Sequence, residues 1–326
     1  MRAIQVVRFG GPEVLVPGEV SEPMPGGGEV VVDVEVADVL FLDTQLRSGW
    51  GQEYFAVSPP YVAGNGVAGT VTSVGAGVDP ALAGRRVIAR VGPAVNGVQV
   101  PMGGYAERAV ASVDGLVEVP DGLASREAVT FLHDGATAVG LLHHAALRPG
   151  ERVLVTAAAG SLGAVLVPRA KAAGATVVAA ARGARKLALV REWGADVAVD
   201  YTEPDWLEAV GAVDVVFDGA GGASGEGAFG LVTPGGRYLS YGAASGEFPR
   251  IDQADARRRG VRHFGINDLR YEGQEARRKL RALMADAAAG RFRPFVGQTF
   301  PLERAADAHA EIEARRTVGK TVLEVG

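Results

Sequence analysis

Residues 153–186 constrain the fold of this chain more than any other stretch. The stretch opens with the apolar, β-branched run Val153–Thr156 and, after a turn of small residues, continues through a helix-permissive run to Gly174. A second apolar run, Thr176–Ala181, predicts a parallel neighbour for the first strand, because strands buried on both faces are almost continuously apolar. Strand, small-residue turn, helix and strand in this order predict a βαβ unit.

The turn of this unit has the spacing of a dinucleotide-binding loop. Ala158, Gly160 and Gly163 fill the three small positions of G-x-G-x-x-G, and they lie between two predicted strands. Small residues there let the backbone approach a pyrophosphate at a helix N-terminus. The sequence therefore predicts a pyrophosphate site at Ala159, Gly160, Ser161, Leu162 and Gly163, in which Ser161 can add a hydroxyl donor.

Basic residues follow the second strand of the unit, where the choice between NAD and NADP is made. NAD-binding sites normally present Asp or Glu there to bind the ribose 2′-hydroxyl, but this chain has Ala181 followed by Arg182, Arg185 and Lys186. Arg182 or Lys186 can donate charge-assisted hydrogen bonds to a 2′-phosphate, each contributing roughly 1.5–3 kcal/mol. The alternative is a solvated helix start. Basic residues at a helix N-terminus oppose the helix dipole, however, and this favours NADPH binding.

Composition excludes several function classes. The 326-residue chain has a formal net charge of −5 with scattered charges, so it shows no basic footprint for nucleic acid. It contains no cysteine, which excludes disulfides, thiolate nucleophiles and cysteine-containing zinc sites. No window approaches the roughly 18 consecutive apolar residues of a membrane span, and the first residues lack the apolar core of a signal peptide. We therefore expect a cytoplasmic protein that binds neither membranes nor nucleic acid.

The order of predicted elements indicates two domains. Residues 1–121 are β-rich, with short strands at Ala3–Val7, Glu29–Val36, Val67–Val74, Arg86–Ala89 and Ala106–Ala111. From about residue 124 strands and helices alternate, and six strands are predicted at 152–157, 176–181, 197–200, 213–218, 237–242 and 261–266. This alternation predicts an α/β fold with a doubly wound parallel sheet, although Pro168 lies inside the first helix of that sheet. The chain end returns to the β-rich body, giving one domain of 1–121 and 267–326 and another of 122–266.

A series of motifs along the chain resembles a known family. AAAGSLG is followed by REWGADVAVDY, FDGAGG, GGRYLSYGAASG and a terminal GKTVLEV. The series resembles the medium-chain dehydrogenase/reductase superfamily and, within it, the zinc-independent NADPH:quinone oxidoreductases, which are similar to zeta-crystallin. The resemblance implies a GroES-like β-rich catalytic domain, a Rossmann domain that binds NADPH, and a homodimer joined through the sixth strand. It also implies cofactor contacts from Thr137, Tyr201, Gly242, Ala243, Phe264 and Ile266.

The chain departs from the zinc-dependent members of that superfamily at each metal-ligand position. Those positions fall on Leu40, on Asn65 and on about Leu132 or His133, and the GHE triplet of those enzymes reads Gly64-Asn65-Gly66 here. Zinc requires three or four N, S or O ligands, which this set does not supply, so we expect no metal. Many quinone reductases carry Asn at the position of Leu40 and Tyr at that of Gln45, so the substrate stays open.

Four residues are candidates for the chemistry. Hydride transfer needs positioned reactants, donors that stabilise the charge developing on an oxygen, and a route for a proton. We expect these donors to be Asn65, His133 and Tyr54, and Gln45 is a further candidate. The alternatives are that Asn65 only hydrogen-bonds the backbone of its own loop, that His133 only completes hydrogen bonds at the end of a helix, and that Tyr54 packs as an ordinary loop side chain.

These observations predict an NADPH-dependent reductase of a small planar quinone or an α,β-unsaturated carbonyl compound. One alternative is an enoyl-thioester reductase of the same fold, acting on a CoA or acyl-carrier-protein substrate. Another is a non-catalytic protein that binds NADPH, for instance as a redox sensor.

Overall fold

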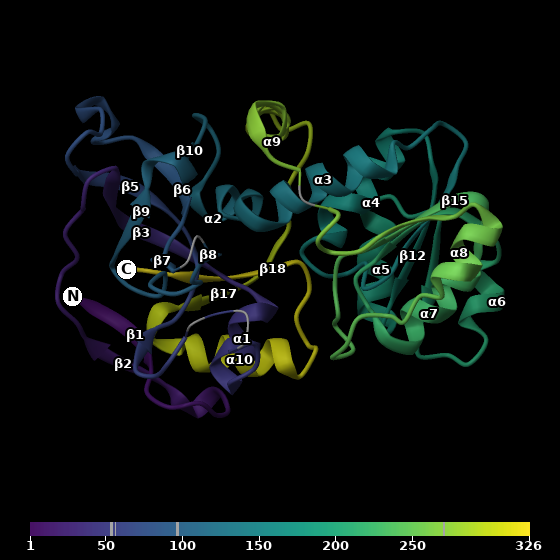
Figure 1. Ribbon diagram of the computed structural model, residues 1–326, viewed down its shortest axis with the longest axis horizontal. Helices are drawn as coiled ribbons and strands as arrows, with labels where there is room; N and C mark the ends of the chain where they lie inside the picture. Colours follow the sequence, from purple (N-terminus) through teal and green to yellow (C-terminus); the bar gives the residue numbers. More distant parts are fainter. Residues whose placement is uncertain (53–54, 56, 96–97, 270) are drawn as a thin grey trace. The chain divides into compact units, whose positions relative to one another are not determined.

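The computed structural model describes residues 1–52, 55, 57–95, 98–269 and 271–326, and it divides into two compact units (Figure 1). Unit 1 comprises Met1–His133 and Arg281–Gly326, and unit 2 comprises Asp134–Leu280. We expected the divisions after residues 121 and 266. The structure places the first one later because the short helix α2 (Ser125–Ala128) belongs to unit 1, where Ser125 Oγ donates to Glu35 Oε2 of strand β3 at 2.6 Å. The second division lies inside α9 (Gly273–Ala288).

Unit 1 is built around one mixed sheet. Its strand order is β10-β6-β5-β3-β18-β17, and β9 pairs with β3 over part of its length. The bounds are β3 Glu29–Val39, β5 Gly66–Val74, β6 Arg86–Arg90, β9 Arg108–Ser112, β10 Val117–Glu118, β17 Val296–Pro301 and β18 Lys320–Glu324. A second sheet has the order β2-β1-β4, with β1 Arg2–Val6, β2 Leu15–Glu19 and β4 Tyr61–Val62, and β7 Ala94–Val95 pairs with β8 Val98–Gln99.

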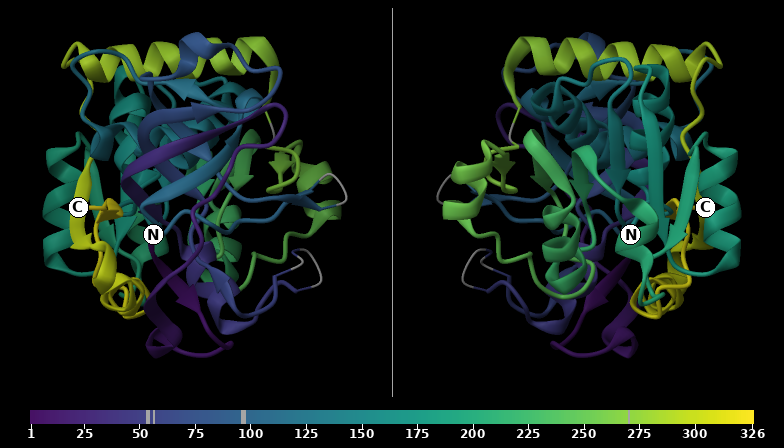
Figure 2. Two further views of the ribbon diagram at one scale, coloured as in Figure 1. Left: turned by 90° about the vertical axis from the view of Figure 1, so that its left-hand side faces the viewer. Right: turned by 90° about the vertical axis from the view of Figure 1, so that its right-hand side faces the viewer.

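The C-terminal end of the chain completes unit 1. Strand β18 pairs antiparallel with β3, so that Val322 faces Asp38 and Thr321 faces Val39. Helix α10 (Ala305–Glu313) packs against α1 (Phe41–Ser48) and lies beside the N-terminal segments, including the short 3-10 helix η1 (Pro12–Val14), as Figure 2 shows. The alternating valines of β3 and β5 bury one face of the sheet in the core of this unit.

Unit 2 is a doubly wound sheet, as the sequence predicts. Six parallel strands have the order β13-β12-β11-β14-β15-β16, so the order reverses between β11 and β14. The strands are β11 Arg152–Val155, β12 Thr176–Ala181, β13 Val197–Asp200, β14 Val213–Asp218, β15 Val232–Ser240 and β16 Arg262–Phe264. The helices are α3 Ala136–Ala145, α4 Gly163–Ala172 with Pro168 inside it, α5 Ala184–Glu192, α6 Trp206–Val210, α7 Gly222–Gly230 and α8 Gln253–Arg259.

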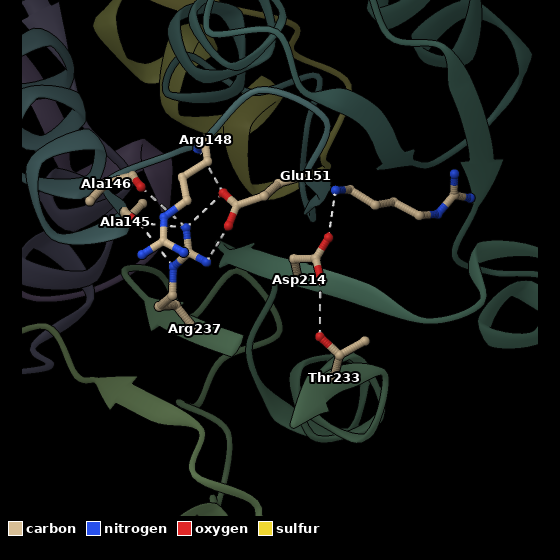
Figure 3. Close-up of polar contacts among 8 residues, drawn as sticks. Ala145, Ala146, Arg148, Glu151, Asp214, Thr233 and Arg237 are labelled. Atoms are coloured by element: carbon tan, nitrogen blue, oxygen red, sulfur yellow. Dashed lines mark hydrogen bonds and ion pairs between the residues drawn. The ribbon is translucent and has the colours of Figure 1, made fainter. Parts of the chain in front are cut away.

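A buried arginine of β15 ties the end of α3 to the start of β11 (Figure 3). Arg237 donates to Ala145 O from Nε and Nη2 at 2.9 and 2.7 Å, and it contacts both carboxylate oxygens of Glu151 at 2.7 and 2.8 Å. The Arg237 hydrogen bonds lower the pKa of Glu151 although burial opposes this. Arg237 thus satisfies carbonyl groups that the end of a helix leaves without partners.

Within the described ranges, every helix is too short or too polar to span a bilayer.

Candidate active site

Polar side chains from four segments of unit 1 meet around the carboxylate of Asp38. Asp38 is the penultimate residue of β3, and Lys320 is the first residue of its neighbour β18. Asn65 directly precedes β5, the other neighbour of β3. His133 lies in a π-helical turn, Phe131–Gly135, a type of turn that is frequent at functional sites.

The four side chains form a continuous series of contacts. His133 Nδ1 lies 2.9 Å from Asp38 Oδ2, and Lys320 Nζ lies 3.0 Å from the same oxygen. On the far side of the imidazole ring, His133 Nε2 lies 2.7 Å from Asn65 Oδ1, and Asn65 Nδ2 donates to Val91 O at 3.0 Å. The structure therefore places two of the sequence-predicted candidates, Asn65 and His133, in direct contact.

Burial couples the charges of this cluster. The side chains of Asp38 and Lys320 are 0% and 2% exposed, whereas that of His133 is 16% exposed. Burial alone would raise the pKa of Asp38, but the charges of Lys320 and His133 and their hydrogen bonds outweigh it, so the pKa is lowered. Asp38 therefore stays a carboxylate, and His133 is the most accessible of the three charged or titratable side chains.

A glycine provides the space that the cluster occupies. A Cβ at Gly66 would lie 2.4 Å from Asp38 Oδ1 and 2.8 Å from His133 Cε1. Gly66 stands at the third position of the triplet that reads GHE in zinc-dependent relatives. Its lack of a side chain is what allows Asp38 and His133 to approach each other there.

The donor set of this cluster does not fit zinc. Asp38 and His133 are the potential ligands, but an ammonium group, Lys320 Nζ, lies 3.0 Å from the carboxylate and repels a second cation. Among the residues that the structure describes, three or more His, Cys, Asp or Glu side chains nowhere gather into a metal-binding group.

A second polar network links α10 to the start of α1 in the same unit. Arg47 Nε donates to His309 Nδ1 at 3.3 Å, so His309 carries its proton on Nε2 and donates it to the Tyr105 hydroxyl at 3.1 Å. Tyr105 in turn donates to Asp43 Oδ2 at 3.0 Å, and this oxygen also accepts the Leu40 N–H at 2.8 Å. The network thus fixes the first turn of α1 directly after Leu40.

Burial sets the protonation states of this second network. It lowers the pKa of His309 to about 3, with a smaller contribution from the charge of Arg47. It also raises the pKa of Asp43 to about 7, and the nearby charge of Asp38 adds to this effect. His309 is therefore neutral at pH 7, and Asp43 changes its charge near neutral pH.

In unit 2 the predicted pyrophosphate loop lies between β11 and α4. A Cβ at Gly163 would lie 1.9 Å from Ala158 O, so only glycine permits this close contact of helix and turn. Gly160 is exposed, whereas Ala159 and Leu162 are buried. The Ser161 hydroxyl, which the sequence suggests as a donor to phosphate, instead donates to Asp134 Oδ1 at 2.9 Å.

The end of β12 combines the expected basic residues with a carboxylate. Arg182 is exposed and Lys186 is half-buried in the first turn of α5. Asp200, at the end of β13, accepts the Gly183 N–H at 2.7 Å with Oδ2, and its Oδ1 accepts the hydroxyl of Thr202 at 2.6 Å. Burial raises the pKa of Asp200, but these hydrogen bonds and the charge of Arg182 outweigh it and lower the pKa.

A buried carboxylate shapes the loop after β14. Thr156 Oγ1 donates to Asp218 Oδ1 at 2.6 Å, and Thr156 Oγ1 accepts the N–H groups of Gly219 and Ala220 at 3.0 and 3.1 Å. Ala244 N–H then donates to Gly219 O at 3.3 Å, which joins this loop to the one after β15. The two loops are therefore held side by side at the carboxyl ends of their strands, where doubly wound sheets bind ligands.

The other predicted cofactor contacts lie at the same edge of the sheet or at the start of α3. Tyr201 follows β13 and packs against the core of unit 2. Those that remain are Gly242 and Ala243 in the loop after β15, Phe264 at the end of β16, the exposed Ile266, and Thr137 in the first turn of α3.

Sequence reasoning missed several residues of the unit 1 site. Asp38 and Lys320 were not predicted, although a charged residue at the end of an apolar strand and the lysine of GKTVLEV are visible in the sequence. Tyr54 lies outside the described residues. Gln45 lies in α1, half-buried.

Comparisons with known proteins agree with this architecture. Residues 26–121 match the family described as alcohol dehydrogenase GroES-like domain, and residues 193–323 match the one described as zinc-binding dehydrogenase. The chain is 33% identical to a quinone oxidoreductase of Pseudomonas aeruginosa, over 99% of both chains. It is 31% identical to a 2-haloacrylate reductase of a Burkholderia species, over 98% of both chains. The structure of Escherichia coli quinone oxidoreductase complexed with NADPH aligns with a TM-score of 0.85 at 27% identity, covering 99% of this chain and 100% of that one.

Proposed function

Because this chain belongs to the quinone oxidoreductase family of the medium-chain dehydrogenases and reductases, we propose that it is an NADPH-dependent reductase of quinones or α,β-unsaturated carbonyl compounds. The observation that carries the proposal is the full-length match to a quinone oxidoreductase at 33% identity. The two-unit architecture, with a doubly wound sheet in unit 2, supports it.

Unit 2 supplies the cofactor site in this proposal. Its fit to NADPH rests on the tight turn that only Gly163 permits and on the basic residues after β12. The turn Ala159–Gly163 would hold the pyrophosphate, and Arg182 and Lys186, with Tyr201 beside them, would bind the 2′-phosphate. The residues that would surround the rest of the cofactor are Thr137, Gly242, Ala243, Phe264 and Ile266. When bound, NADPH supplies the hydride.

His133 serves the acceptor in this proposal, and Asn65, whose amide is engaged by Val91 O and His133 Nε2, holds the ring in place. Reduction of a quinone consumes one hydride and one proton, and reduction of a conjugated C=C bond has the same balance. Negative charge develops on the acceptor oxygen, where a positioned donor stabilises it and delivers the proton. His133 is such a donor because its ring is fixed on one side by Asp38 and remains partly exposed.

The test is NADPH oxidation, followed at its absorbance band, against a panel of acceptors. The panel comprises 1,4-benzoquinone, 9,10-phenanthrenequinone, an alkenal and crotonyl-CoA. We expect turnover of a quinone or of the alkenal. Turnover of crotonyl-CoA alone would point to the enoyl-thioester reductase instead. Tight NADPH binding without any turnover would point to a non-catalytic protein.

A second candidate substrate class is an unsaturated carboxylate. The observation that favours it is the 31% identity to a 2-haloacrylate reductase over 98% of both chains. The acceptor is again an electron-poor carbon conjugated to oxygen, so the same residues would act. Adding 2-chloroacrylate to the panel decides between the classes: a kcat/KM above that for every quinone would replace the leading proposal.

We also propose that the protein acts in the cytoplasm as a homodimer joined through β16. This strand is at the edge of the parallel sheet and has a neighbour on one side only within the described chain. Light scattering on the purified protein should give twice the chain mass of 33.6 kDa. A monomer at micromolar concentration would contradict this.

A further inference from the structure

We propose that Asp38 holds His133 as a doubly protonated imidazolium, and that Asp38 and Lys320 are positioning residues that act on its charge in opposite directions. The protonation of His133 does not depend on what reaction the protein catalyses. The catalytic consequence rests on the proposed reductase function.

The hydrogen-bond partners of His133 require two protons on its ring. Nδ1 faces the Asp38 carboxylate at 2.9 Å, and an ionised carboxylate only accepts hydrogen bonds. Nε2 faces Asn65 Oδ1 at 2.7 Å, and an amide oxygen likewise only accepts. A neutral ring has one nitrogen without a proton, and the lone pair of this nitrogen would point at the lone pair of an acceptor oxygen. This is costly at a partly buried site.

The orientation of the Asn65 amide is fixed by its other neighbour. Asn65 Nδ2 donates to Val91 O at 3.0 Å. Turning the amide over would offer a donor to His133, but it would also bring Oδ1 against the Val91 carbonyl oxygen inside a buried site. The orientation with Oδ1 toward His133 is therefore the one that satisfies both contacts.

Lys320 competes with His133 for the same carboxylate oxygen. Both cations contact Asp38 Oδ2, at 3.0 and 2.9 Å. The other titratable groups that act on Asp38 or Lys320 are Asp43 and Tyr105. Asp38 favours the charge on His133 by attraction, and Lys320 disfavours it by repulsion and by sharing the carboxylate.

His133 is the member of the cluster that a substrate can reach. With Asp38 negative and Lys320 and His133 positive, these three side chains carry one net positive charge, and the two other members are almost fully buried. A substrate oxygen that displaces Asn65 Oδ1 from Nε2 would meet both the charge and a proton. The chain's own cations thus supply the electrostatic stabilisation that zinc gives its metal-dependent relatives.

Nitrogen NMR of the histidines tests the first part directly. The chain has five histidines, so a His133→Gln variant identifies the His133 signals in ¹⁵N-labelled protein. At pH 7 we expect both nitrogens of His133 to show the shifts of protonated nitrogen. His309 is the internal control, because its pKa is lowered to about 3 and it should show one protonated nitrogen. One unprotonated nitrogen on His133 at pH 7 would overturn the assignment.

Opposite substitutions test the second part. Asp38→Asn keeps the shape of the side chain and removes its negative charge, which favours the protonated ring of His133. The alkaline decline of kcat/KM for the quinone should therefore move to lower pH by at least about one unit, which is a tenfold loss of kcat/KM on the alkaline side of the decline. In Lys320→Met the decline should move to higher pH. Asp33→Asn, on the exposed side of the same strand, is the matched control and should leave the profile unchanged. If both variants lose activity but their alkaline declines do not move in opposite directions, Asp38 and Lys320 have a merely structural role.

A double variant and the wild-type protein separate these effects from unfolding and from a failure of the reductase function. Removing one partner of a buried ion pair can unfold a protein, so Asp38→Asn/Lys320→Met, which removes both charges, is measured as well and should show a singly protonated His133 at pH 7. A protonated His133 in that double variant would contradict the role of Asp38. If the wild type shows an imidazolium but reduces no acceptor, the reductase proposal fails and the protonation assignment stands.

Discussion

Removing the hydroxyl of Tyr105 should destabilise unit 1 by about 2–4 kcal/mol. The hydroxyl donates to Asp43 Oδ2 at 3.0 Å and accepts from His309 Nε2 at 3.1 Å, at a side chain that is fully buried. Tyr105→Phe loses the bond donated to Asp43, worth about 0.5–1.5 kcal/mol, and it leaves the buried His309 N–H without its acceptor, which costs about 1–3 kcal/mol with that second bond included. The Asp43 carboxyl keeps its bond from the Leu40 N–H.

The cost should also depend on pH. The Tyr105 hydrogen bond lowers the pKa of Asp43 against the stronger effect of burial, which raises it to about 7. The bond therefore matters most to the ionised carboxyl, and the loss of stability should be larger at pH 8 than at pH 6. In Asp43→Asn, which cannot ionise, Tyr105→Phe should cost the same at both values.

Urea unfolding followed by circular dichroism, at pH 6 and pH 8, measures both effects. A loss of 2–4 kcal/mol corresponds to a fall of roughly 5–15 °C in Tm for a unit of this size. A loss below about 0.5 kcal/mol at both pH values would contradict the buried network, because it would mean that the hydroxyl has no buried partners to lose.

Three further changes test other parts of the structure. Arg237→Met should cost about 3–5 kcal/mol in thermal unfolding, because the little-exposed Glu151 carboxylate keeps only the Arg148 N–H and loses its buried arginine partner; a loss under 1 kcal/mol would contradict the burial of this pair. Arg182→Ala should raise KM for NADPH about tenfold or more and leave KM for NADH unchanged; an equal effect on both would remove the 2′-phosphate assignment. His309→Gln should make the free energy of unfolding fall as pH rises from about 4 to 7. The pKa of Asp43 is about 7 in the folded protein and 3.8 in the unfolded chain, so uptake of this proton stabilises the fold at low pH, and the gain is lost as pH rises between these two values. The wild type should show a flatter profile there, because the lowered pKa of His309 has the opposite effect between about 3 and 6.5; identical profiles would contradict the buried, neutral His309.

The fold of unit 2 was predictable because its strands are buried on both faces. Runs such as Thr176–Ala181 are continuously apolar, and the observed bounds of β12 coincide with the prediction. The start of β15 was predicted five residues late, at 237 instead of 232, because Pro234, Gly235 and Gly236 indicate a turn. The structure accommodates them with a register shift between β14 and β15.

Unit 1 was harder to predict because local signals mislead at sheet edges. The strand β2 has the sequence LVPGE, and its proline and glycine argue against a strand. The structure places β2 at the edge of its sheet, where Pro17 needs no ladder partner on its outer side.

Two of the four residues in the unit 1 site could be predicted from their positions in motifs, and the other two depend on pairing between distant strands. Asn65 and His133 were found because they stand at positions where relatives hold a metal. Asp38 and Lys320 meet only through the antiparallel pairing of β3 with β18, which no local pattern reveals. The protonation of Asp43 likewise depends on burial by residues far along the chain.

We propose that this chain transfers hydride from NADPH to a conjugated acceptor with the help of His133. The most direct measurement is kcat/KM for 9,10-phenanthrenequinone with NADPH, in the wild type and in His133→Ala, across pH 6–8. We expect turnover by the wild type and a loss of about 100-fold or more in the variant, with KM for NADPH unchanged. A variant that keeps the full wild-type kcat/KM across this range would contradict the role of His133, and a wild type that binds NADPH but reduces no acceptor would contradict the function itself.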